Sequence, residues 1–63
     1  MNKYSYKGPV MRYDRCVEDN WKAETVAPSL AKARSNFMYQ WKQENGYIQR
    51  IKIELPGKIT LIG

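Results

Sequence analysis

The fold is decided by residues 27–46, APSLAKARSNFMYQWKQENG, the one stretch in which a helical period, a start signal and a stop signal occur together. Pro28 suits the first turn of a helix, where a missing N–H costs nothing, and Gly46 suits the left-handed residue that ends one. At 100° per residue, one face of this helix collects the apolar residues Leu30, Ala33, Phe37 and Trp41, with Arg34 and Met38 at its edge. We therefore expect a helix that covers a core through this face.

The two arms that flank the helix show the alternation of half-buried strands. Residues 10–17 alternate, and Trp21, Ala23 and Thr25 share one face of a second strand, so residues 10–26 are predicted to form an antiparallel hairpin with its turn at residues 18–20. Gly8-Pro9 predicts a bulge or an edge, since proline cannot donate to a ladder. In the second arm, residues 47–54 are predicted to form a strand, which a three-residue loop around Pro56-Gly57 joins to a strand at residues 58–62.

These elements predict an α+β fold, a single small domain over residues 1–63 with the order ββαββ and one helix packed on one face of an antiparallel sheet. Trp21, Phe37 and Trp41 should pack between sheet and helix. Tyr4, Tyr6 and Tyr47 are either strand formers with exposed tips or rings for a partner to stack on. The other sheet face is expected to stay open and to mix apolar with basic side chains: Val10, Val26, Ile48, Ile62, Arg12, Arg50 and Lys52.

Length and composition limit what can stabilise this chain. A domain of 63 residues has little core, so a staple or a partner is usually needed. Cys16 is the only cysteine, which excludes an intrachain disulfide, and without histidine a structural zinc site is not expected. We therefore expect a small homo-oligomer, in the simplest case a homodimer. The sequence has no apolar run long enough to span a bilayer, so we expect no membrane partner and a cytoplasmic location.

The residue types that usually carry catalysis are missing or isolated. Without histidine the commonest general base is absent, and Cys16 has no imidazole to activate it, so we expect a small apolar filler at this position rather than a nucleophile. The acidic residues near the first hairpin lack the spaced oxygens and the glycine of a calcium loop, and we expect a solvated acidic turn: Asp14, Glu18, Asp19 and Glu24. The sequence thus predicts a protein that is not an enzyme and uses no metal or other cofactor.

The charge balance points to an anionic partner. Eleven Lys and Arg against six Asp and Glu leave a net charge of +5, although the basic residues are spread along the whole chain. On the helix, the side opposite the apolar face holds an aromatic ring among cations and amides: Lys32, Ser35, Tyr39, Lys42 and Gln43. This side is either a binding face or a merely soluble one.

Five short segments spread over nearly the whole chain resemble a pattern found in short uncharacterised basic proteins of Firmicutes phages, prophages and conjugative elements. They are residues 6–10 (YKGPV), 21–23 (WKA), 32–36 (KARSN), 39–42 (YQWK) and 55–58 (LPGK). The resemblance implies a setting, because small basic proteins of mobile elements commonly handle DNA or inhibit a host defence enzyme.

Two functions remain open from the sequence. The first is a nucleic-acid-binding accessory protein that holds DNA or RNA through its phosphates without reading bases, with Tyr39 stacking on a base and four cations neutralising phosphates: Lys32, Lys42, Arg50 and Lys52. The alternative is a protein-binding module, such as a phage-encoded inhibitor or an assembly subunit, that uses the open sheet face or an unpaired strand edge.

Overall fold

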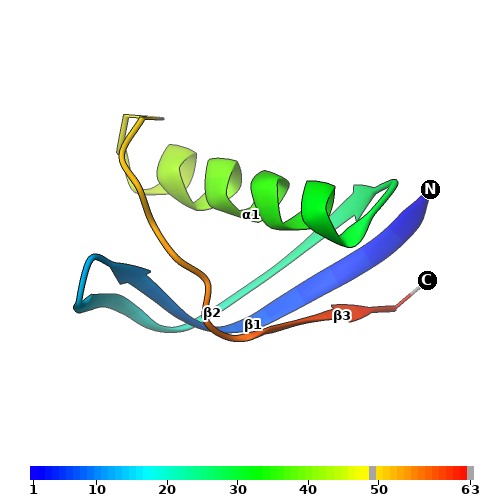
Figure 1. Ribbon diagram of the computed structural model, residues 1–63, viewed down its shortest axis with the longest axis horizontal. Coiled ribbons are helices and arrows are strands. Elements are labelled where there is room, and N and C mark those ends of the chain that lie inside the picture. The colour runs from blue at the N-terminus through cyan, green and yellow to red at the C-terminus, as the bar shows by residue number, and fades with distance from the viewer. Residues whose placement is uncertain (49, 63) are drawn as a thin grey trace.

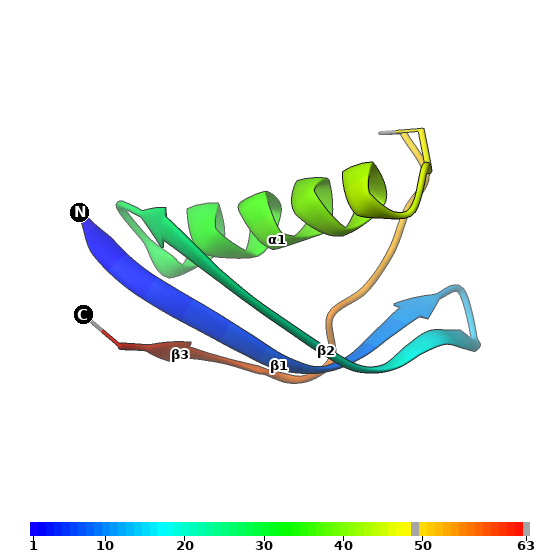
Figure 2. The same ribbon diagram turned by 180° about the vertical axis from the view of Figure 1, so that it is seen from behind.

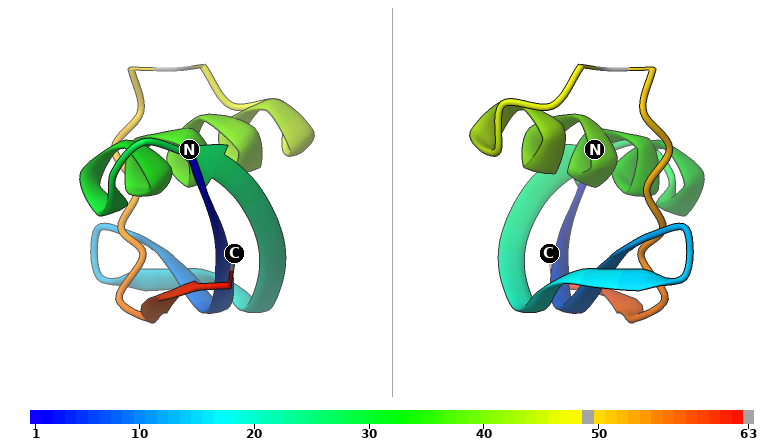
Figure 3. Two further views of the ribbon diagram at one scale, coloured as in Figure 1. Left: turned by 90° about the vertical axis from the view of Figure 1, so that its right-hand side faces the viewer. Right: turned by 90° about the vertical axis from the view of Figure 1, so that its left-hand side faces the viewer.

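A computed structural model describes residues 1–48 and 50–62 and shows one helix lying over one face of a three-stranded antiparallel sheet (Figure 1). The elements are β1 (Asn2–Arg12), β2 (Arg15–Ala27), α1 (Leu30–Glu44) and β3 (Lys58–Leu61), and the strand order in the sheet is β2-β1-β3. Seen from behind and from the two ends, the sheet is strongly twisted and its second face is uncovered (Figures 2 and 3). The predicted α+β class is confirmed, but the element order is ββαβ rather than ββαββ.

The helix forms close to where the sequence predicts it, although Pro28 lies just before the N-cap residue and not in the first turn as expected. The Ser29 hydroxyl caps its start by accepting a hydrogen bond from the Lys32 N–H at 3.2 Å, and Gly46 follows its end with a φ of 72°. Ala33, Phe37 and Trp41 are buried as expected. Leu30, which was expected on the buried face, is instead 52% exposed.

The first hairpin turns five residues earlier than predicted. Its turn lies at Tyr13-Asp14, between paired Arg12 and Arg15, and not at residues 18–20. This register places Tyr6 opposite Ala23, so that alternate residues of both strands face the helix. The expected exposed tips of Tyr4 and Tyr6 are therefore wrong, since both rings are buried in the core. Val10, predicted for the open face, is buried as well.

The predicted strand at residues 47–54 does not form in the part of this range that the structure describes, residues 47–48 and 50–54. Within this segment one bridge, between Met11 and Glu54, joins the chain to β1. Farther along, β3 pairs with the same edge of β1, from Lys58 opposite Lys7 to Leu61 opposite Tyr4. Glu54 and β3 thus pair with the same edge of β1 at two separate places, and the chain does not fold back as a hairpin at Pro56-Gly57. The gap between the pieces lies where Gly8-Pro9 faces Pro56-Gly57, and neither proline can donate to a ladder.

The hydroxyl of Tyr6 bridges this gap. It donates a hydrogen bond to the Pro9 carbonyl at 2.6 Å and accepts one from the Gly57 N–H at 3.0 Å. The Tyr6 ring is 1% exposed, and its centroid lies 6.0 Å from those of both Trp21 and Phe37. A Cβ atom on Gly57 would lie 2.8 Å from the hydroxyl oxygen, so only glycine allows this approach. One side chain therefore joins the core, the bulge in β1 and the start of β3.

Tyr6→Phe should destabilise the protein by about 1–3 kcal/mol, because it leaves a partly buried N–H and a partly buried carbonyl without their partner while keeping the ring. Urea unfolding followed by tryptophan fluorescence measures this loss. Tyr39→Phe is the matched control, since that hydroxyl lies at the surface and accepts a bond from Gln43. Equal midpoints for the two variants would contradict the bridging role.

Candidate nucleic-acid interface

The uncovered side of the sheet carries lysines on all three strands. Alternation places Lys3, Ser5 and Lys7 of β1 on this side, because Tyr4 and Tyr6 between them face the core. The cross-strand partners of these three residues share the same side. We call this surface the outer sheet face; it consists of Lys3, Ser5, Lys7, Lys22, Glu24, Val26, Lys58 and Thr60.

Three lysines form a row across the outer sheet face, one on each strand. Lys7 of β1 is directly opposite Lys22 of β2 on one side and Lys58 of β3 on the other. Side chains in such positions start about 5 Å apart at Cβ, and like charges there repel. All three are exposed, and no ion pair with another described residue involves any of them. We call Lys7, Lys22 and Lys58 the lysine row.

The surroundings of the lysine row leave its charge uncompensated. Glu24 is the one carboxylate on the outer sheet face, and its oxygen lies 3.2 Å from the Lys3 ammonium instead. Ser5 and Thr60 place hydroxyl groups in the next row of side chains. A hollow of about 420 Å³ lies beside the row, lined by Ser5, Tyr6, Lys7, Lys22, Ala23 and Glu24. Ammonium and hydroxyl groups are the side chains that contact phosphate oxygens in nucleic-acid complexes.

The structure does not gather the five residues predicted from the sequence into one site. Lys32 and Tyr39 are exposed on the helix, on the side turned away from its buried residues. Arg50 and Lys52 are also exposed, but they lie in the connection that follows the C-terminal end of the helix (Figure 1). Lys42 is only 9% exposed, so its expected place on the solvent side is wrong. The Tyr47 N–H donates to the Lys42 carbonyl at 2.9 Å and brings the following segment against this last helical turn.

The lysine row was missed because it depends on strand register. Lys7 and Lys22 become neighbours only when the hairpin turns at Tyr13-Asp14, and Lys58 joins them only when β3 pairs with β1. The available signal was the segment Tyr4-Ser5-Tyr6-Lys7, whose strict alternation marks Lys7 as outward-facing if both tyrosines belong to the core.

Cys16 is exposed, so the expectation of a buried filler is wrong. Its thiol donates to the Glu18 carbonyl at 3.3 Å and to an Asp19 carboxylate oxygen at 3.4 Å. Desolvation of the thiol, together with this bond to Asp19 and the nearby carboxylates, raises the pKa of Cys16 above its usual value. The thiol therefore stays protonated at neutral pH, which makes it a poor nucleophile. Residues 1–48 and 50–62 contain no group of three or more acidic, histidine or cysteine side chains placed to hold a metal ion.

No protein-family model, curated protein or solved structure matches this chain. In the part of the chain that the structure describes, the helix is too short and too polar to cross a membrane.

Proposed function

We propose that this protein is a non-enzymatic accessory protein that binds DNA or RNA through phosphates, with the outer sheet face as its contact surface. The observation that carries the proposal is the lysine row, in which Lys22, Lys7 and Lys58 are held side by side across three strands. The lysine row thus keeps three like charges close together in a small domain that has little core to offset their repulsion. A bound polyanion turns this repulsion into attraction, because each phosphate oxygen can be shared between neighbouring ammonium groups.

The geometry of the row suits a nucleic-acid backbone. Strands lie about 4.8 Å apart, so the row spans roughly 10 Å, a length over which duplex DNA carries about six phosphate charges. The surface bears short hydroxyl side chains next to the ammonium groups, which supports contacts with phosphates rather than with base edges. This proposal fits the mobile-element setting that the sequence resemblance implies, and we place the activity in the cytoplasm.

Replacing all three lysines of the row by glutamine should nearly abolish binding to a labelled 20-base-pair duplex in fluorescence anisotropy at low salt. In the unmodified protein, log K should fall with log salt with a slope of about −2.7 or steeper, since each neutralised phosphate contributes about −0.9. The variant should lose this part of the slope. It should also resist urea at least as well as the unmodified protein, because the substitution removes repulsion between paired residues.

Lys32→Gln combined with Arg50→Gln and Lys52→Gln is the matched control, since it removes the same charge from exposed positions outside the outer sheet face. This variant should keep most of the affinity. A larger loss in the control than in the row variant would assign binding to the residues predicted from the sequence. Absence of any binding at low salt would remove the proposal and favour the protein-binding alternative.

We infer in addition that two copies associate through β2. This strand has 13 residues and lies at an edge of the sheet, so one side of its backbone is not paired within the described residues. Val26, the second-to-last residue of this strand, is an apolar side chain that is 55% exposed. Pairing β2 with its copy would extend the sheet and bring two lysine rows onto one surface.

Light scattering at micromolar concentration should return twice the chain mass of 7.4 kDa. Val26→Lys should return the mass of one chain, because a charge at the edge opposes strand pairing. Ile48→Lys is the control: Ile48 is similarly exposed, at 53% against 55% for Val26, but lies in the connection after the helix. A monomer mass for the unmodified protein contradicts this inference, and a dimer lost only in the Ile48 variant assigns the interface elsewhere.

A further inference from the structure

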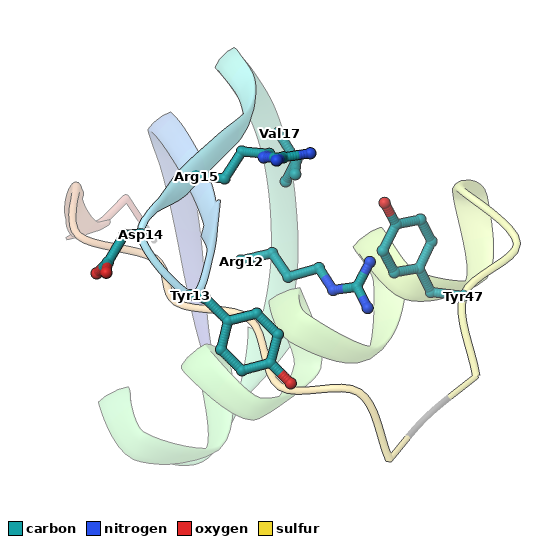
Figure 4. A pocket seen from close by; sticks show the side chains of 6 residues that line it. All are labelled: Arg12, Tyr13, Asp14, Arg15, Val17 and Tyr47. Carbon is teal, nitrogen blue, oxygen red and sulfur yellow. The ribbon is translucent and has the colours of Figure 1, made fainter.

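A hollow at the tip of the first hairpin faces the end of the helix (Figure 4). Its volume of about 570 Å³ is within the roughly 300–1,000 Å³ of sites that hold small organic groups. We call it the hairpin-tip pocket; it is lined by Arg12, Tyr13, Asp14, Arg15, Val17 and Tyr47.

Tyr13 lines this pocket and has an unfavourable backbone conformation. Its backbone φ is 58°, a conformation that bulky residues rarely adopt and that glycine or asparagine accepts readily in a hairpin turn. The side chain is 73% exposed, so little packing compensates for this conformation. Backbone strain of this kind is concentrated at binding sites, where a side chain must be presented to a ligand.

The wall opposite Tyr13 is rigid and aromatic. The Tyr47 ring packs edge-on against Trp41, with centroids 4.9 Å apart, and Trp41 is itself buried. Between the two tyrosines lies the Arg12 guanidinium, 5.8 Å from the Tyr13 centroid and 5.5 Å from the Tyr47 centroid (Figure 4). Its Nε atom is buried and has no hydrogen-bond partner among the described residues.

The pocket carries positive charge that its own carboxylate does not offset. Arg12 and Arg15 are directly opposite each other in the hairpin, and neither forms an ion pair with a described residue. Asp14 sits between them in the sequence, but its carboxylate points away from the arginines and the tyrosine rings (Figure 4). The site therefore offers the exposed ring of Tyr13 and two guanidinium groups that form no ion pair with a described residue to a ligand that is both planar and anionic.

We infer that the hairpin-tip pocket takes one unpaired nucleobase of a bound nucleic acid, with the base stacked on Tyr13 and the adjoining phosphates held by Arg12 and Arg15. This inference rests on the proposed function and deepens it. Within a duplex, neighbouring base pairs cover both faces of each base, so only an unpaired base presents a face to Tyr13. The protein then prefers single strands, bulges or ends over a perfect duplex while still reading no particular base.

Three labelled probes test this preference by fluorescence anisotropy: a 20-base-pair duplex, the same duplex with one bulged thymidine, and the same duplex with an abasic residue in the bulge. The unmodified protein should bind the thymidine bulge about 5- to 150-fold more tightly than the perfect duplex, as expected for one base stacked on an aromatic ring. The abasic bulge keeps the phosphates and the distortion but lacks the base, so it should lose this gain.

Tyr13→Gly is the decisive variant, because glycine accepts the φ of 58° and the hairpin therefore keeps its fold. It should bind all three probes equally, with unchanged affinity for the perfect duplex, while Tyr13→Phe should keep the preference. Tyr39→Ala removes a ring that is also exposed but does not line this pocket, and it should keep the preference too.

A thymidine preference that survives in Tyr13→Gly, or that is absent from the unmodified protein, overturns the inference. If binding to the perfect duplex still depends on the lysine row, the proposed function stands without the inference. If the unmodified protein binds none of the probes, both fail.

Discussion

The buried hydroxyl of Tyr6 is the contact on which the rest of this structure depends. Two proline-containing pairs, Gly8-Pro9 and Pro56-Gly57, meet where β1 would otherwise carry a continuous ladder, and neither proline has an N–H to donate. The hydroxyl supplies a donor to Pro9 and an acceptor to Gly57. Because the Tyr6 ring is packed against both Trp21 and Phe37, the position of β3 is tied to the core, and Lys58 is thereby placed beside Lys7.

Charge is arranged against stability at two places along the first hairpin. The lysine row crosses the sheet at its centre, and Arg12 faces Arg15 at the tip. Both arrangements pair like charges, and at the tip Tyr13 adds an unfavourable backbone conformation. A domain of this size has little stability to lose. An anionic ligand that relieves the repulsion at both places is the simplest physical reason for such an arrangement. The strands that build the core then also present both binding surfaces.

The helix could be predicted from the sequence because its signals are local: Pro28 near the start, Gly46 after the end and a 3.6-residue period between them. The hairpin turn could not, because Tyr13-Asp14 lacks the glycine or asparagine that marks such turns, whereas Glu18-Asp19-Asn20 resembles one. Residues 47–54 alternate like a strand, yet among those that the structure describes only Glu54 pairs with β1. The lysine row unites residues 51 positions apart, so its existence depends on tertiary pairing that periodicity does not show.

Chemical-shift mapping by ¹⁵N-edited NMR, with a perfect DNA duplex titrated into the labelled protein at low salt, tests the central claim most directly. The account predicts that the largest shifts fall on the amides of Lys7, Lys22 and Lys58 and their neighbours on the outer sheet face, and that they vanish as salt is raised. Largest shifts around Lys32 and Tyr39 on the helix, or shifts that persist at high salt, would contradict it.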